Sequence, residues 1–528
     1  MSTADTVDAA GTDGALPVWS VDPRTGERVE QVAVEAGAAD VDRAVRAAHA
    51  ALPALADRTR RAAFLRSVAE ELEVDGERIT AAADRESALG LPRLTGELAR
   101  AAYQFRAFAE VVEEGGYLDV RIDHADPQAQ PVPRPDLRRW RTPLGVVAVF
   151  AASNFPLAFS VSGGDTASAL AAGCPVVAKA HPDHPATSEL TAAAIRRAAA
   201  AHGLDENVLV PLHGRQAGVD LVRHPLVAAV GFTGSVQGGR FLFDQAAARP
   251  NPIPFHGELG SLNPVLVTER AAAARAEELG SGLAGSFTLG MGQFCTKPGL
   301  VLVPAGAAGD RLEKALAASA ADAPAGALLD PRIRESFLAG FAERAALPGV
   351  SVALEAGAAE GERAVEGAPL AVRPGFLTVP AERLLAGEDH RALLEECFGP
   401  VTVVVRYDGA EQAAAVLAAV GGNLTATLHA EPDEPEAGEL LARLAGIAGR
   451  VLFGGWPTGV AVAPAQHHGG PYPSSTSTST SVGATAIERW LRPVTYQNAP
   501  QRLLPAELRD AGLPGLPRHV DGVLTTGA

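Results

Sequence analysis

The chain of 528 residues contains few cysteines and few lysines. Its three cysteines, Cys174, Cys295 and Cys397, lie far apart and have neither the pairing of a disulfide framework nor the spacing of a zinc site. No apolar run approaches the ~18 residues of a membrane span, and residues 1–16, predicted to be a flexible tail, lack the segments of a signal peptide. These absences predict a cytoplasmic protein without a metal site or a membrane partner.

Positive charge is also scarce, with 45 basic against 62 acidic residues and a net charge of −17. No block of Lys or Arg is present, which indicates that nucleic acid is not a partner. Only three of the basic residues are lysines, and Asn occurs only six times. Because an ammonium and a guanidinium differ in geometry, Lys179 becomes a candidate for a role that demands lysine, and the rarity of Asn makes Asn154 a similar candidate.

Short β-rich runs alternate with helical segments along most of the chain. Apolar residues recur every three or four positions between 40 and 114, and β-rich runs alternate with helical ones across 144–256 and again from 262 to 456. Such alternation is typical of parallel sheets with crossover helices. The sequence therefore predicts an α/β fold with two doubly wound, Rossmann-like domains, one made of residues 17–123 and 144–256 and the other of residues 257–456.

Three segments do not follow this alternation. Residues 124–143 contain four prolines before Pro143 and are predicted to be extended. Residues 457–500 begin rich in Pro, Gly, Ser and Thr, include the Ser/Thr run 474–481, and end in a strand-like stretch. Residues 501–528 are predicted to form a polar C-terminal tail.

Three candidate catalytic side chains lie beside glycines or at strand ends. Cys295, in GSFTLGMGQFCTKPG, has small neighbours that leave space for a substrate, which suits a thiolate nucleophile. Glu258 ends an apolar strand in HGELGSLNP and is placed to act as a general base. Asn154 follows GVVAVF, and its amide is a candidate oxyanion donor. The structural alternatives are a buried thiol, a turn carboxylate and an Asx-turn.

These segments resemble the aldehyde dehydrogenase superfamily. Finer features such as KAHPDHPATSE and GGPYPSST resemble the branch that contains α-ketoglutaric semialdehyde (2,5-dioxopentanoate) dehydrogenases and the NADP-dependent fatty aldehyde dehydrogenase of luminous bacteria. The ordered motifs that carry the resemblance are ASNFPL, GCPVVAKAHP, GFTGS, ELGSLNP, GQFCT and EECFGP.

The resemblance implies the oxidation of an aldehyde to a carboxylic acid by NAD or NADP. Cys295 would form a thiohemiacetal and then a thioester, Glu258 would activate the deacylating water, and Asn154 would stabilise the oxyanion. The branch implies 2,5-dioxopentanoate as substrate and 2-oxoglutarate as product, with a fatty or other aldehyde as the alternative. The resemblance also implies a set of cofactor-binding residues, namely Lys179, Gly234, Ser235, Gly239, Glu396 and Phe398.

One departure from the family pattern bears on cofactor choice. NAD-preferring members commonly have an acidic residue where this chain has Pro182, and Arg215 is a candidate partner for the 2′-phosphate of NADP. A solvated loop arginine is the alternative for Arg215. We predict that NADP is accepted, with NAD also usable.

The resemblance further implies that residues 124–143 and 457–500 form a small β oligomerisation arm, which would make the protein a homodimer or homotetramer. Relatives place the loop that corresponds to residues 474–481 near the substrate entrance. A hypothesis of another class is a non-redox cysteine hydrolase or esterase, which needs a histidine base. No sequence motif links His467 or His468 to Cys295.

Overall fold

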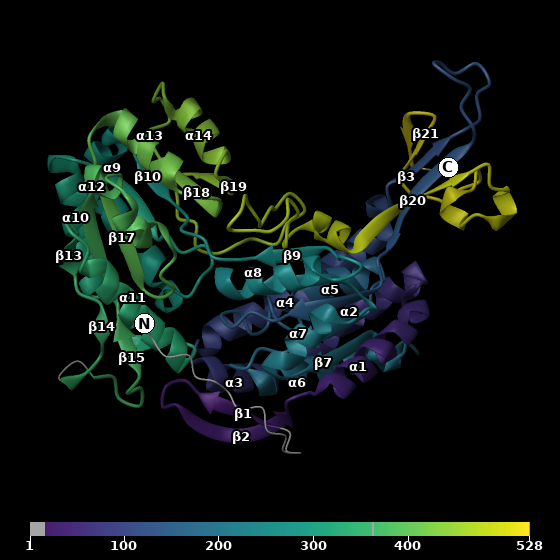
Figure 1. The fold of residues 1–528 in the computed structure, drawn as a ribbon, viewed down its shortest axis with the longest axis horizontal. Coiled ribbons are helices and arrows are strands. Elements are labelled where there is room, and N and C mark those ends of the chain that lie inside the picture. The colour runs from purple at the N-terminus through teal and green to yellow at the C-terminus, as the bar shows by residue number, and fades with distance from the viewer. Residues whose placement is uncertain (1–15, 362–363, 527–528) are drawn as a thin grey trace.

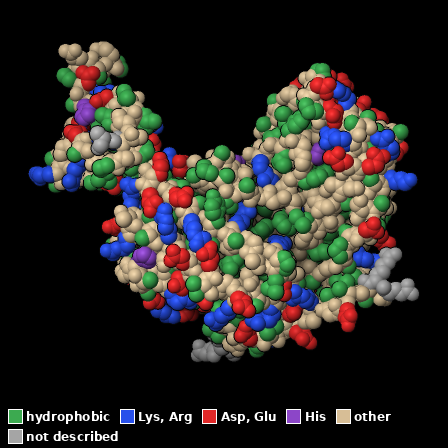
Figure 2. All heavy atoms as spheres, turned by 180° about the vertical axis from the view of Figure 1, so that it is seen from behind, with side chains coloured by type: hydrophobic (Ala, Val, Ile, Leu, Met, Phe, Trp, Pro, Cys, Tyr) green, Lys and Arg blue, Asp and Glu red, His purple; other side chains and the backbone are tan. Residues whose placement is uncertain are grey.

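The computed structural model describes residues 16–361 and 364–526, which form two α/β lobes and a projecting arm (Figure 1). All but the last residue of the predicted tail, 1–16, lies outside the described residues. On the face shown in Figure 2, basic and acidic side chains are intermixed and do not gather by sign.

The first lobe contains a five-stranded parallel sheet in the order β7-β6-β5-β8-β9. Because the five strands are parallel, their carboxyl ends share one edge of the sheet. The chain crosses outward in both directions from the central strand β5, and α/β proteins bind ligands at this edge. The strands are β5 (Val146–Phe150), β6 (Val176–Lys179), β7 (Leu209–Leu212), β8 (Val227–Thr233) and β9 (Phe255–Glu258), and the helices between them are α5 (Gly164–Ala172), α6 (Pro185–Ala201), α7 (Arg215–Arg223) and α8 (Val236–Ala247).

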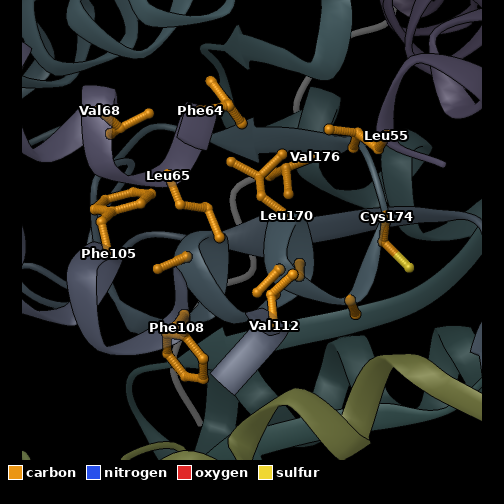
Figure 3. Close-up of a cluster of buried hydrophobic side chains, with 14 of the residues drawn as sticks. Leu55, Phe64, Leu65, Val68, Phe105, Phe108, Val112, Leu170, Cys174 and Val176 are labelled. Atoms are coloured by element: carbon orange, nitrogen blue, oxygen red, sulfur yellow. The ribbon is translucent and has the colours of Figure 1, made fainter. Parts of the chain in front are cut away.

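The helical layer predicted for residues 40–114 is present and packs on this lobe. Its apolar stripes meet α5 and β6 in a continuous core, where Phe64, Phe105, Leu170 and Val176 are fully buried and point toward one another (Figure 3). Burial of aliphatic and aromatic side chains on this scale is the main favourable contribution to folding. The helices are α1 (Ala38–Ala50), α2 (Arg58–Val74), α3 (Gly76–Ser87) and α4 (Leu91–Glu114).

A hairpin that the sequence analysis did not anticipate precedes these helices. Strands β1 (Pro17–Asp22) and β2 (Glu27–Val34) pair antiparallel. Gly26 ends the turn between them with a φ of +79°, a conformation that favours glycine.

The second lobe contains a seven-stranded sheet in the order β13-β16-β17-β11-β10-β18-β19, parallel except for the edge strand β13. A three-stranded antiparallel sheet, β12-β15-β14, lies in the same lobe. The strands are β10 (Val265–Val267), β11 (Leu300–Pro304), β12 (Gly326–Ala327), β13 (Ser351–Leu354), β14 (Gly357–Ala358), β15 (Ala371–Arg373), β16 (Gly375–Pro380), β17 (Val401–Tyr407), β18 (Asn423–His429) and β19 (Ala448–Phe453). The helices are α9 (Glu269–Thr288), α10 (Ala307–Ala321), α11 (Pro331–Ala345), α12 (Ala381–Leu384), α13 (Gly409–Ala419) and α14 (Ala437–Ala445).

The arm is a five-stranded sheet that projects from the first lobe, on the side away from the second (Figure 1), and its composition differs from the prediction. Residues 518–525, predicted to lie in a polar tail, form two of its strands. The turn between them is Asp521-Gly522, both with positive φ, which is a strong hairpin signal that the sequence analysis passed over. In order across the sheet, the strands are β20 (Leu491–Gln497), β4 (Leu137–Pro143), β3 (Val120–Asp123), β21 (Arg518–Val520) and β22 (Val523–Thr525).

The Ser/Thr run also lies elsewhere than predicted. Residues 474–481 were assigned to the arm, but they run beside β9 of the first lobe, where Ser475 forms a β-bridge with Glu258. Within the described residues, no helix is long and apolar enough to span a membrane.

Candidate active site

A cleft of about 630 Å³ draws its lining from both lobes, so neither lobe forms it alone. Glu258, at the carboxyl end of β9, lines it together with Asn154, which follows β5. Cys295 enters from the other lobe, after α9. The lining also includes four residues predicted from the sequence to bind the cofactor, Gly234, Ser235, Glu396 and Phe398.

The thiol of Cys295, the carboxylate of Glu258 and the imidazole of His468 meet within 4.8 Å of one another. Nε2 of His468 lies 3.5 Å from Sγ of Cys295 and 2.8 Å from Oε1 of Glu258. Only the contact with sulfur is aligned as a hydrogen bond, and Oε1 has no aligned donor. The contact between His468 and Glu258 is therefore electrostatic and not an aligned hydrogen bond. No sequence motif linked His468 to Cys295, so this residue was not predicted.

The surroundings shift the pKa values of Cys295 and Glu258 in opposite directions. Burial raises the pKa of Cys295 well above its usual value, and the neighbouring Glu258 carboxylate adds to the rise. Burial would also raise the pKa of Glu258, but the nearby His468 and the hydrogen bond from Ser481 outweigh it, so the net shift is downward. At neutral pH this places the proton on Cys295 and leaves Glu258 ionised.

The Ser/Thr run positions Glu258. The hydroxyl of Ser481 donates to Oε2 of Glu258 over 2.8 Å. The Thr476 hydroxyl accepts from the N–H of Gly257 and donates to the carbonyl oxygen of Phe255, which fixes the end of β9. A run of small hydroxyl side chains suits this place because each can satisfy a backbone or carboxylate group without filling the site.

The loop that carries Cys295 is held by buried polar side chains. Nδ2 of Asn263 donates to the carbonyl oxygens of Cys295 and Lys297 at 2.8 and 2.9 Å. The ammonium of Lys297 donates to the carbonyl oxygens of Cys397 and Val401, both at 2.8 Å. These bonds connect the loop 396–401 to the loop that carries Cys295. Neither Asn263 nor Lys297 was recognised from the sequence as part of the site.

Glycine is required where these two loops touch. Gly292 has a φ of +66°, and a Cβ at this position would lie 2.2 Å from the carbonyl oxygen of Gly399. A larger residue would force the loops apart and move the thiol.

Asn154 lies beside the nucleophile segment. Its side-chain amide is buried and donates to the carbonyl oxygen of Gln293 over 3.0 Å. An amide nitrogen carries two protons, so this bond leaves one N–H for an oxyanion. The backbone carbonyl oxygen of Asn154 accepts a hydrogen bond from the guanidinium of Arg93 over 2.7 Å.

The start of α8 is suited to a phosphate group. Ser235 caps this helix, its hydroxyl accepting from the N–H of Gly238. The backbone N–H groups of a helix's first turn, together with the helix dipole, attract an anion. Gly239 packs tightly beneath, since a Cβ there would lie 2.1 Å from Cδ2 of Leu259. These features fit the pyrophosphate of a dinucleotide.

Glu396 lines the same cleft. It is buried, which raises its pKa to about 7, while Lys297 and the Ser261 N–H act in the other direction. Gly260 allows its close approach, because a Cβ there would lie 2.7 Å from Oε2. A carboxyl group in this position is a hydrogen-bond partner for a ribose hydroxyl.

Lys179, at the end of β6, has two acidic neighbours that were not predicted from the sequence. Burial lowers the pKa of Lys179 to about 8, while the charges of Asp183 and Glu35 act in the other direction. Glu35 also packs against Gly214, 3.1 Å from the position of a Cβ there. Pro182 is neutral, but two carboxyl groups nevertheless lie near this lysine, one of them far away in sequence.

Arg215 is the first residue of α7 and is exposed. Its charge acts on Lys179, so the two cations are neighbours. Within the described residues it forms no ion pair, which leaves its guanidinium available.

The other two cysteines have different surroundings. Cys174 is fully buried, which raises its pKa to about 11. Cys397 packs against the cluster that contains Phe337 and Phe341, and it also lines the cleft.

A family model described as the aldehyde dehydrogenase family matches residues 12–495. The chain belongs to this family. It is 45% identical over 520 residues to α-ketoglutaric semialdehyde dehydrogenase 2 of Azospirillum brasilense, covering 97% of each chain. It is 43% identical to α-ketoglutaric semialdehyde dehydrogenase of Acinetobacter baylyi, covering 92% of this chain and 91% of the relative.

The fold comparison agrees with this assignment. The crystal structure of γ-glutamyl-γ-aminobutyraldehyde dehydrogenase from Burkholderia cenocepacia superimposes with a TM-score of 0.77 at 24% identity, covering 91% of this chain and 92% of the other. The predicted family and the predicted α/β fold are thus confirmed, and this aldehyde dehydrogenase uses NAD or NADP.

The hydrogen bond from Ser481 yields a prediction for this aldehyde dehydrogenase. In Ser481→Ala, the pKa of Glu258 should rise because one donor to its ionised form is lost. The acid limb of the pH–rate profile should then move to higher pH, with the rate above neutrality nearly unchanged. Steady-state rates between pH 5 and 9 measure this.

Ser477→Ala is the matched control, because Ser477 contacts His256 and makes no contact with Glu258. An unchanged acid limb in Ser481→Ala would show that this bond does not tune the base.

Proposed function

We propose that this aldehyde dehydrogenase oxidises 2,5-dioxopentanoate (α-ketoglutaric semialdehyde) to 2-oxoglutarate. The observation that carries this is the 45% identity over nearly the full length to a relative named for that substrate. The close approach of Cys295, Glu258 and His468 supports the same chemistry.

The first step forms a bond between sulfur and the aldehyde carbon. The neutral imidazole of His468, with Nε2 3.5 Å from Sγ, takes the thiol proton as the sulfur attacks and becomes positively charged. The free N–H of Asn154 donates to the oxygen of the resulting thiohemiacetal. A nicotinamide bound in the cleft supplies the acceptor for the hydride that leaves this carbon.

The second step releases the acid. Glu258 takes a proton from a water molecule, which attacks the thioester carbon and expels the sulfur of Cys295. The low pKa of Glu258 keeps it ionised for this purpose at neutral pH. His468, protonated in the first step, lies close enough to return a proton to the leaving thiolate.

Two substitutions separate these steps. Glu258→Gln should form the acyl enzyme once per site and then stall, because an amide cannot accept a proton from water. Intact-protein mass spectrometry after addition of aldehyde and cofactor should detect the adduct, and Cys295→Ala should show no adduct while still binding the cofactor. Normal steady-state turnover by Glu258→Gln would contradict the assignment of the base.

The contact between Cys295 and His468 also supports a second candidate, a cysteine hydrolase or esterase that needs no redox step. The two candidates differ in their need for cofactor. Reduction of nicotinamide on addition of aldehyde, followed by absorbance, supports the oxidoreductase, whereas ester hydrolysis without any aldehyde oxidation would support the hydrolase.

We propose that both NADP and NAD serve as cofactor, with Lys179 at the adenosine ribose and Arg215 available to the 2′-phosphate. A forked, charge-assisted pair contributes roughly 1.5–3 kcal/mol. Arg215→Ala should therefore lower kcat/KM for NADP by roughly tenfold or more relative to NAD. Glu35→Gln should act in the opposite direction, because a carboxylate near the ribose repels the phosphate.

Arg223→Ala is the matched control, since this arginine is on the same helix and bonds to Gln245. An NADP to NAD ratio that neither Arg215→Ala nor Glu35→Gln alters would contradict both assignments.

We propose that the protein is cytoplasmic and assembles into a homodimer or homotetramer through the arm. The edge strand β22 exposes Val523 and Leu524, at 63% and 62%. Exposed apolar residues on an edge strand favour pairing with another chain. Light scattering after size exclusion should give a multiple of the chain mass, and the double variant Val523→Lys, Leu524→Lys should lower it. An unchanged mass would exclude this edge from the interface.

A further inference from the structure

Helix α4 carries an arginine whose guanidinium is only partly used by the protein. Nη1 of Arg100 donates to the carbonyl oxygen of Val460, and its Cζ lies 5.3 Å from the ring centroid of Phe159. Nε and Nη2 are buried and have no hydrogen-bond partner among the described residues. These two nitrogens form the edge with which arginine pairs with both oxygens of a carboxylate.

Two separate chains of contacts place this edge near the nucleophile. The ring of Phe159, on which Arg100 lies, is 6.0 Å from the ring of His468, and His468 contacts Sγ of Cys295. On the other side, Val460 follows Gly459, whose N–H donates to the hydroxyl of Thr296, the residue after Cys295.

The charge of Arg100 is not neutralised locally. Glu97, one turn earlier on α4, uses Oε1 to accept from the N–H groups of Leu157 and Ala158. Among the described residues, no carboxylate forms an ion pair with Arg100. Burial lowers the pKa of Arg100, and Cys295, Glu97 and Glu258 are the acids whose charges act against this shift. A buried, unpaired guanidinium is costly unless a ligand completes it.

Two neighbouring arginines lack such an edge. Arg450 donates through both terminal nitrogens to the carbonyl oxygens of Gly459 and Pro457, so it is committed to the loop. Nη1 of Arg93 is also unpartnered among the described residues, but Nη2 donates to the backbone carbonyl oxygen of Asn154, so neither two-nitrogen edge is free. The guanidinium lies against Phe155 and Phe294, with Cζ 5.0 and 4.6 Å from their ring centroids.

We propose that Arg100 binds the carboxylate at the far end of the substrate and so selects ω-oxo carboxylates over uncharged aldehydes. This inference rests on the proposed function and names the residue that determines its specificity. The sequence analysis found no anchor for an anionic substrate, because one arginine among 42 carries no distinguishing motif.

The test compares substrates of matched length with and without the charge. In Arg100→Met, kcat/KM for 2,5-dioxopentanoate and for 4-oxobutanoate should fall by roughly 10- to 100-fold, the range expected for a lost charge-assisted pair. The value for pentanal should change by only a few-fold, and most of the loss should appear in KM. Arg100→Lys should recover part of the activity toward the two acids, since it keeps the charge and loses the fork.

Arg106→Met is the matched control, because Arg106 lies on the same helix and pairs with Glu73 at the surface. An equal loss of kcat/KM for pentanal and for the acids would show that Arg100 acts through the loop at Val460. An unchanged kcat/KM for both acids would show that Arg100 does not bind their carboxylate. Either result would overturn the proposal. If the wild-type enzyme prefers 4-oxobutanoate to 2,5-dioxopentanoate and Arg100→Met still lowers both, the proposed substrate fails while the anchor stands.

Discussion

A buried carboxylate beside a thiol is the constraint on which the site depends. Glu258 is 4% exposed, and an ionised carboxylate in such surroundings is unfavourable unless neighbouring groups stabilise it. Ser481 stabilises it with a hydrogen bond and His468 does so with its charge once protonated, and both belong to the segment that returns from the second lobe to lie along β9. The path of residues 468–481 is thus coupled to the protonation state of the base.

Two sets of residues meet at Cys295. The cleft that Cys295 lines also contains Ser235 at the start of α8 and Glu396. Phe159 and Arg100 lead to the same sulfur through His468, and the loop at Val460 leads to it through Thr296. The tight contact between Gly292 and Gly399, with the buried Lys297, keeps this geometry from relaxing.

Much of the fold was accessible from the sequence because it depends on local patterns. The alternation of strands and helices over 144–256 predicted a parallel sheet, and helical spacing predicted the layer over 40–114; both are present. The arm was only partly anticipated. Strands β21 and β22 are three residues each, too short for a periodic pattern, and only the Asp521-Gly522 turn marked them.

The site divides in the same way. Cys295, Glu258 and Asn154 could be proposed from the sequence because each lies in a distinctive short motif at or beside a turn. His468, Ser481, Arg100 and Glu35 could not, because their roles come from contacts between segments that are distant in the chain. His468 is 173 residues from Cys295, and Ser481 is 223 residues from Glu258. Motifs record local backbone and residue type, whereas hydrogen bonds and charges act through space, so only the tertiary structure decided which histidine and which hydroxyl lie beside Cys295 and Glu258.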